Sequence, residues 1–279
     1  MHAPDPTPAY GRRELVLVAV LLVAMTRLVE QPAAFVVASM LPFVIVVAGV
    51  GILDRDDTTV RPVGALLIPA VLTGGAGAAI GLIQPGLGLV PYLAAFAFLL
   101  DRTLALEMRL LAQPGVATDS DRARVLLAAV AAAFVAFTGV AALVPGGMAQ
   151  PGGAAGVAGV AGTGAQLAEG GIVVLAAADA LVAAVLGFRV ATFRYGTARD
   201  AAHSALTYAI VVAVAAGAIR AIGLPLLVGP AVLTLVFYLW DALHGTAPAR
   251  RREPRFLWET ILLIVLAGVV VAWNLRLRS

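Results

Sequence analysis

The stretch Arg124–Val144, RVLLAAVAAAFVAFTGVAALV, decides the class of fold. It carries no charged side chain after Arg124, and an α-helix of about 20 residues rises about 30 Å, which matches the hydrocarbon thickness of a bilayer. In the whole chain, 61% of the 279 residues are hydrophobic and 13% are charged, whereas a soluble domain carries roughly 25% charged residues. The sequence therefore predicts an all-α polytopic integral membrane helix bundle, with residues 1–279 forming a single transmembrane domain.

Similar apolar stretches predict about nine transmembrane helices along the chain. They cover Glu14–Val29, Ala33–Leu53, Pro62–Ile83, Leu89–Leu111, Arg124–Val144, Gly170–Ala191, Ala201–Ile222, Pro225–His244 and Phe256–Asn274. The first stretch is short and follows Arg12 and Arg13, as the apolar part of a signal peptide would. No small-x-small cleavage pattern comes after it, so we expect it to be retained. If that stretch lies on the membrane surface instead, eight spans remain.

The placement of arginine predicts how the chain is oriented. All 19 basic residues are arginine, and most of them gather in every second loop. The excess of positive charge in cytoplasmic loops then places the N-terminal tail, residues 1–12, in the cytoplasm and the C-terminus outside, in a bacterial inner membrane. Residues 146–169 are rich in glycine and are expected to form a flexible extracytoplasmic loop. No repeat is evident between the two halves that flank this loop, so the sequence does not favour an inverted-repeat transporter.

The composition excludes several kinds of chemistry. The chain has no cysteine, which excludes a disulfide, a thiolate nucleophile and an iron–sulfur cluster. It has no lysine, which excludes a Schiff base and the lysine of a phosphate-binding loop. The sequence requires no cofactor and contains no recognisable catalytic motif, so we do not expect an enzyme. Because the loop arginines explain the net charge of +3, we expect the lipid bilayer and not nucleic acid as the partner.

Several charged residues are predicted to lie within the membrane. Asp179 lies about nine residues inside its span, where a charge costs roughly 2.5–3.5 kcal/mol unless it has a partner. Arg27 and Arg220, near the same end of their own spans, are the candidate partners. Their role is either an ion pair that holds helices together or a protonatable carboxylate in a transport path. Asp101 and Arg102 are adjacent in another span and point about 100° apart, so at least one should face the bundle interior.

Two Asp-x-x-His pairs are predicted to lie at similar depth near the cytoplasmic edge of two antiparallel spans. Together with a glutamate from each of two other spans, such pairs resemble the ligand set of a di-metal site in a helix bundle. The candidate metal ligands are Asp200, His203, Asp241, His244, Glu107 and Glu259. The alternatives are a haem held between the two histidines, a pocket for a polar substrate or headgroup, and simple capping of the helix ends.

The motif Gly77-x-x-x-Gly81 predicts a smooth helix face that another helix can approach closely. That helix could belong to this chain, to a second copy in a homo-oligomer or to a partner subunit. From all these features we expect a module that binds or transports a small molecule or a lipid. The alternatives are a non-catalytic subunit or scaffold of a larger membrane complex, and a membrane-embedded metalloprotein or enzyme that uses the His/Asp/Glu cluster.

Overall fold

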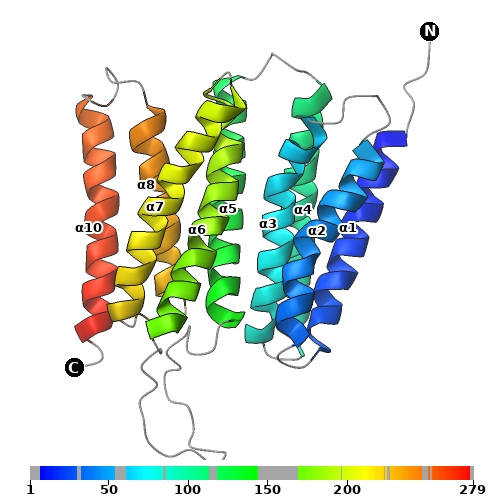
Figure 1. Cartoon of the computed structure of the whole chain (residues 1–279), viewed down its shortest axis with the longest axis horizontal. Helices are drawn as coiled ribbons and strands as arrows, with labels where there is room; N and C mark the ends of the chain where they lie inside the picture. The colour runs from blue at the N-terminus through cyan, green and yellow to red at the C-terminus, as the bar shows by residue number, and fades with distance from the viewer. Residues whose placement is uncertain are drawn as a thin grey trace, which may run out of the picture.

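The structure, a computed structural model, is a bundle of long helices that run side by side (Figure 1). It describes residues 7–29, 33–53, 61–83, 86–112, 118–143, 169–195, 197–222, 224, 227–246, 251 and 253–276. The helices of these residues are α1 (Thr7–Thr26), α2 (Ala33–Leu53), α3 (Arg61–Ala79), the short 3-10 helix η1 (Ile80–Leu82), α4 (Leu89–Ala112), α5 (Asp119–Leu143), α6 (Glu169–Ala191), α7 (Ala198–Ile222), α8 (Val228–Gly245) and α10 (Pro254–Arg276).

The lengths and composition of these helices confirm the predicted fold class. In the described part of the chain, seven helical segments are long and apolar enough to cross a membrane, and they belong to α3 with η1, α4 to α8, and α10. The helices α1 and α2 lie alongside them (Figure 1). In lipid, a helix satisfies every backbone hydrogen-bonding group internally, which is why apolar stretches of this length fold this way. The protein is therefore an all-α polytopic membrane protein.

The ends of the bundle differ in charge. The end at which α1, α5 and α7 begin is called the Arg-rich end here. It carries Arg12, Arg13, Arg109, Arg122, Arg124, Arg194 and Arg199. The helix α1 begins at Thr7, so the predicted N-terminal tail, residues 1–12, is helical in its second half. The predicted glycine-rich loop, residues 146–169, lies outside the described residues except for Glu169, which begins α6.

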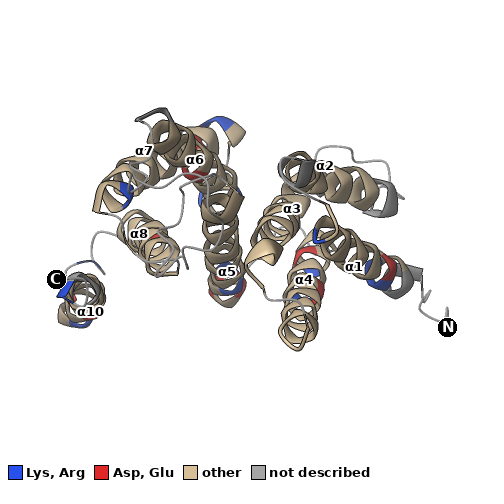
Figure 2. Ribbon diagram, turned by 90° about the horizontal axis from the view of Figure 1, so that it is seen from below, with Lys and Arg blue, Asp and Glu red and all other residues tan. Residues whose placement is uncertain are grey.

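The bundle consists of two four-helix halves and one further helix. In the first half, α1 contacts α2 and α4, and α3 contacts α2 and α4. In the second half, α5 contacts α6 and α8, and α7 contacts α6 and α8, which is the same arrangement (Figure 2). The last helix, α10, packs on α8 at the edge of the second half. Because each half has an even number of helices, both halves begin at the same end of the bundle.

One short stretch of the sequence also matches between the halves. Gly75–Leu82 in the first half reads GAGAAIGL, and Gly217–Leu224 in the second half reads GAIRAIGL, so only the third and fourth positions differ. The halves therefore form a parallel repeat of helix packing, not an inverted one, and the sequence taken as a whole does not make this repeat evident. It is hidden because the glycine-rich segment 146–169 has no counterpart in the first half. This segment makes the separation in sequence between α2 and its equivalent α6 longer than the separation between α1 and α5.

Equivalent close contacts support this alignment. A Cβ atom on Gly49 of α2 would lie 2.6 Å from Cδ2 of Leu66 in α3, and a Cβ atom on Gly187 of α6 would lie 2.8 Å from Cγ of Tyr208 in α7. The alignment that superposes Gly75–Leu82 on Gly217–Leu224 also places Leu66 on Tyr208. Each half therefore uses one glycine at the same place to let its second and third helices approach.

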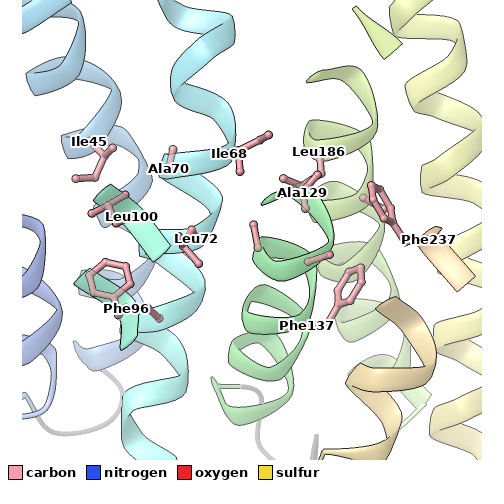
Figure 3. Close-up of a cluster of buried hydrophobic side chains, with 14 of the residues drawn as sticks. Ile45, Ile68, Ala70, Leu72, Phe96, Leu100, Ala129, Phe137, Leu186 and Phe237 are labelled. Atoms are coloured by element: carbon pink, nitrogen blue, oxygen red, sulfur yellow. The ribbon is translucent and has the colours of Figure 1, made fainter. Parts of the chain in front are cut away.

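The two halves meet where α3 packs against α5. A Cβ atom on Gly75 would lie 2.6 Å from Cα of Ala136, and one on Gly139 would lie 2.5 Å from the carbonyl oxygen of Gly75. Buried apolar side chains fill both halves beside this seam, including Phe96 in the first and Phe137 in the second (Figure 3). Close backbone approach through small residues is the usual way in which membrane helices gain dispersion contacts.

The two glycines of the predicted Gly77-x-x-x-Gly81 face lie in different environments. Gly77 lies against Leu41 of α2, so it serves packing within the chain. Gly81 has open space where a side chain would stand. Contact of this face with a second copy or a partner subunit stays a prediction.

Candidate functional site

A cavity of about 560 Å³ lies at the Arg-rich end between α5, α6, α8 and α10. Its walls combine apolar side chains such as Phe193 with several charged ones. Concave sites with a few convergent polar groups are where membrane-embedded and soluble proteins alike bind small molecules. This cavity is therefore the candidate functional site, and it is called the α5–α8 cavity below.

Three polar side chains form a hydrogen-bonded triad, of which Arg194 and Asp241 line the cavity. Arg194 donates from Nη2 to Asp241 Oδ2 at 2.6 Å, and the Tyr208 hydroxyl donates to Asp241 Oδ1 at 2.5 Å. Arg194 Nη1 also donates to the Tyr208 hydroxyl at 3.2 Å. Asp241 and Tyr208 are almost completely buried, whereas the side chain of Arg194 is 20% exposed. Both carboxylate oxygens of Asp241 are thus partnered, as a buried charge requires.

The local sequence positions this triad. Arg194 lies in the turn that follows α6, and its guanidinium occupies the space that a side chain at Gly245 would need. Gly187 lets Tyr208 approach α6, and the Tyr208 ring packs on Phe237 of α8 with 5.2 Å between ring centroids. Two glycines therefore create the room in which the hydrogen-bonded triad forms.

Electrostatics keep Arg194 charged. Burial by itself disfavours the guanidinium ion, but the attraction of the Asp241 carboxylate and the hydrogen bonds to Asp241 and Tyr208 outweigh it, so the pKa of Arg194 is raised above its ordinary value. Arg194 is thus a permanent cation, held in an ion pair whose two charges balance.

The rim of the α5–α8 cavity carries charges of both signs. Arg122 of α5 lies 3.6 Å from Asp119, and Arg255 of α10 donates to Glu259 at 2.9 Å. Glu253 also lines the cavity. The side chains of these two ion pairs are exposed, so their mutual attraction is weak and they are available to a ligand.

The six predicted metal ligands do not come together. Asp241 belongs to the triad, Glu107 pairs with Arg189, Asp200 accepts from Thr197 at 2.7 Å, and Glu259 pairs with Arg255. His244 stacks on Trp240, with 3.8 Å between ring centroids, and its Nδ1 lies 3.1 Å from the Trp240 carbonyl oxygen, while His203 is exposed on α7. Within the described residues, no group of three or more His, Asp or Glu side chains could hold a metal ion. Each carboxylate has a nearer cationic or hydroxyl partner, which the spacing in the sequence did not reveal.

Most of the charged residues that were predicted within the membrane contact a partner in the structure. Asp179 is fully buried, and its Oδ2 accepts from Arg220 Nη2 at 3.4 Å, so one of its two candidate partners is confirmed. The other, Arg27, has a buried Nε atom that makes no hydrogen bond. Asp101 pairs with Arg12 of α1 at 3.0 Å, and the adjacent Arg102 lies over the Phe98 ring, 5.1 Å from its centroid. Asp101 thus faces a neighbouring helix while Arg102 faces outward.

A further ion pair links the two halves. Arg189 of α6 donates from Nε to Glu107 Oε1 of α4 at 3.1 Å, and its Nη2 contacts Glu107 Oε2. Glu107 is buried, and Arg189 also lies over the Phe193 ring. Because α4 belongs to the first half and α6 to the second, this bidentate pair fastens the halves at the Arg-rich end.

Sequence reasoning missed the roles of Tyr208, Arg194 and Arg189. Tyr208 occupies the position of Leu66 in the repeat, so the duplication was the signal that could have identified it as a buried side chain. The two arginines could be placed only with the helix packing in hand, because both lie at the end of α6, where exposed charges are common.

The fold and the site together define a class: a polytopic α-helical membrane protein made of two parallel four-helix repeats and a terminal helix, with a polar cavity in the second repeat. Comparison with protein-family models, with curated protein sequences and with solved structures finds no match to this chain.

Proposed function

We propose that the protein binds a small polar molecule in the α5–α8 cavity and serves as a binding or transport module in the membrane. The observation that carries this proposal is a cavity of about 560 Å³ lined by Arg194 and Asp241, the two charged members of the buried triad. A bundle that only needed to be stable would gain little from such a triad, because apolar residues of similar size usually replace a buried ion pair without loss.

The charges of the cavity indicate the class of ligand. Its lining contains the three arginines Arg122, Arg194 and Arg255 and the four carboxylates Asp119, Asp241, Glu253 and Glu259. Opposite charges side by side complement a molecule that also carries both signs, such as a zwitterion. Parallel repeats of membrane helices also occur in transporters, which supports transport as the use of such a site.

Ligand screening of the purified full chain in detergent tests the proposal. We would follow thermal unfolding with amino acids as zwitterions, dicarboxylates as anions, polyamines as cations and sugars as neutral polar compounds. A ligand present at about 100 times its Kd stabilises the folded state by about 2.7 kcal/mol. We expect the zwitterions to stabilise the protein, and flux into liposomes then separates transport from binding alone.

Two rim variants make this test specific. Arg122→Gln and Glu259→Gln remove exposed charges whose ion pairs contribute little to stability, so both variants should fold. Each should weaken binding by about tenfold, while Arg199→Gln, an exposed arginine of the same end outside the cavity lining, should leave binding unchanged. If none of the four classes stabilises the protein, or if the rim variants bind as the unaltered chain does, the proposed site is wrong.

A second candidate function, a scaffold subunit of a membrane complex, is favoured by α10. This helix packs on α8 and exposes large apolar side chains, including Trp258 at 71%, Leu262 at 66% and Trp273 at 63%. Such a face can meet either lipid or a helix of another subunit. The chain has no cysteine, so Leu262→Cys introduces a single thiol for oxidative cross-linking in membranes. A cross-linked species that forms with Leu262→Cys but not with the control Leu206→Cys on α7 supports the scaffold function. If Leu262→Cys forms no cross-link, the exposed face of α10 is assigned to lipid.

A further inference from the structure

A second cavity, of about 530 Å³, lies on the seam between the halves, where α3, α4 and α5 meet. It is called the α4–α5 groove here. Most of its lining is apolar, with Leu99 and Leu106 from α4 and Leu127 from α5. All the charged residues that line it are arginines, namely Arg102, Arg109 and Arg124. This one-sided charge distinguishes the groove from the α5–α8 cavity, which is lined by both signs.

The arginines of the groove have too few carboxylates. Arg109 and Arg124 share one partner, since both contact Oδ1 of Asp121. Arg102 lies over the Phe98 ring, and no carboxylate of the described residues pairs with it. Three positive charges thus face one negative charge, which leaves an excess of two. A guanidinium at membrane depth is stabilised by an anionic group, and a phosphate oxygen offers the bidentate geometry that arginine prefers.

The groove also has the shape and exposure of a lipid site. Arg102 and Arg109 are two helical turns apart, so the charged part extends about 10 Å along α4. Phe98 is 59% exposed and Leu127 is 69% exposed, so the groove is open on its outer side, where the acyl chains of the bilayer lie. Arg109 and Arg124 lie toward the Arg-rich end, the level of the headgroups, Arg102 lies two turns deeper on α4, and apolar residues such as Leu99 continue below it.

We propose that the α4–α5 groove binds an anionic phospholipid, with the phosphate among Arg102, Arg109 and Arg124 and one acyl chain along Leu99, Leu106 and Leu127. A soluble anion would use the arginines but leave the apolar walls uncovered, which is why the lipid fits better. Basic pockets between membrane helices bind anionic headgroups through the same two contributions. The bound lipid would fill the seam between the two halves. This proposal is independent of any ligand in the α5–α8 cavity.

Quenching by brominated lipid tests it in the full chain. Phe98→Trp places a tryptophan beside the groove and keeps an aromatic face under Arg102. The unaltered chain, with three tryptophans elsewhere, provides the background to subtract. In nanodiscs of phosphatidylcholine, a minor fraction of brominated phosphatidylglycerol should quench the introduced tryptophan several-fold more than the same fraction of brominated phosphatidylcholine. Equal quenching by the two lipids overturns the proposal.

Charge variants show whether the arginines cause the preference. Adding Arg102→Gln and Arg124→Gln should lower the affinity for phosphatidylglycerol by about 30-fold, since each arginine near an anionic lipid contributes about fivefold, and should therefore abolish the difference in quenching between the two lipids. The pair Arg102→Lys and Arg124→Lys keeps the charge and should retain most of the preference, which also shows that the groove tolerates substitution. Arg199→Gln, an exposed arginine of the same end, should change nothing. A preference that survives the glutamine pair, or that a large excess of inorganic phosphate abolishes, contradicts a lipid site.

Discussion

The two four-helix halves share their helix packing but differ in what their cores contain. Where α3 of the first half has the buried Leu66, α7 of the second has the buried Tyr208. In α4 and α8, the buried rings of Phe96 and Phe237 occupy matching positions, and one helical turn after them stand the buried Leu100 and Asp241. The first half thus has the apolar Leu66 and Leu100 at the positions where the second half has Tyr208 and Asp241, which form the triad with Arg194.

The same difference recurs near the opposite end of the bundle. Leu41 of α2 lies against Gly77 of α3, and the equivalent of Leu41 in α6 is Asp179, which pairs with Arg220 of α7. The duplicated packing therefore tolerates either an apolar contact or an ion pair at one position. At both of these positions only the second half has the polar version, and the α5–α8 cavity also lies in the second half.

The largest effect is expected from making the second half resemble the first at Asp241. Asp241→Leu leaves Arg194 and the Tyr208 hydroxyl without their shared acceptor, and breaking a buried pair on one side costs about 3–5 kcal/mol of unfolding free energy. Arg194→Leu added to Asp241→Leu should recover most of that loss. Unfolding by denaturant in detergent measures both variants, and a single substitution that costs less than about 1 kcal/mol would show that the triad contributes little.

A smaller change in stability is expected from substituting the matching glycines, Gly75 in α3 and Gly217 in α7, and the change should have opposite signs at the two positions. Gly75→Ala drives a methyl group into the backbone of α5 at Ala136 and should cost about 1–3 kcal/mol by overpacking. Gly217 is its equivalent in the repeat and has open space, so Gly217→Ala should stabilise the chain by roughly 0.4–1 kcal/mol. Thermal unfolding of the two variants side by side is the measurement. Equal effects would mean that α3 does not approach α5 as closely as the structure shows.

The smallest effect is expected at the ion pair that joins α1 to α4 at the Arg-rich end. Arg12 and Asp101 are 28% and 36% exposed, so neither is as fully buried as Asp241, and Asp101→Asn should cost less than Asp241→Leu. In the second half, Ala242 of α8 occupies the position that matches Asp101 of α4, so this pair has no counterpart there. A double-mutant cycle with Arg12→Gln measures the coupling free energy between Arg12 and Asp101. A value as large as the coupling between Arg194 and Asp241 would mean that the ion pairs of the two halves do not differ in strength.

Prediction from the sequence worked for the properties that each helix has by itself. The apolar stretches predicted the helices closely: the predicted span Leu89–Leu111 is the helix Leu89–Ala112, and the predicted span Gly170–Ala191 is the helix Glu169–Ala191. The sequence also predicts Asp179 as a charge within the membrane and Arg220 as a candidate partner, because depth along a helix follows from residue number alone, and the structure shows this pair.

Prediction failed where the answer depended on the rotation and neighbours of a helix. Asp241 and His244 lie within one turn of the same helix, yet the carboxylate is buried against Arg194 while the imidazole is exposed beside Trp240. Glu107 was considered a metal ligand, but the packing of α4 against the second half places Arg189 next to it. Residue spacing gives the depth of a side chain but not the helix that it faces, and each of these carboxylates paired with the nearest cation.

The sequence by itself determined that this protein is a helical membrane protein, because a chain with such long uncharged stretches must satisfy its backbone in lipid and can do so one helix at a time. The tertiary structure alone decided which charges pair, and that the second half contains a polar cavity and the seam a groove lined by arginines. Those features arise from contacts between helices far apart in the chain, where one glycine or one turn of rotation changes which side chains meet.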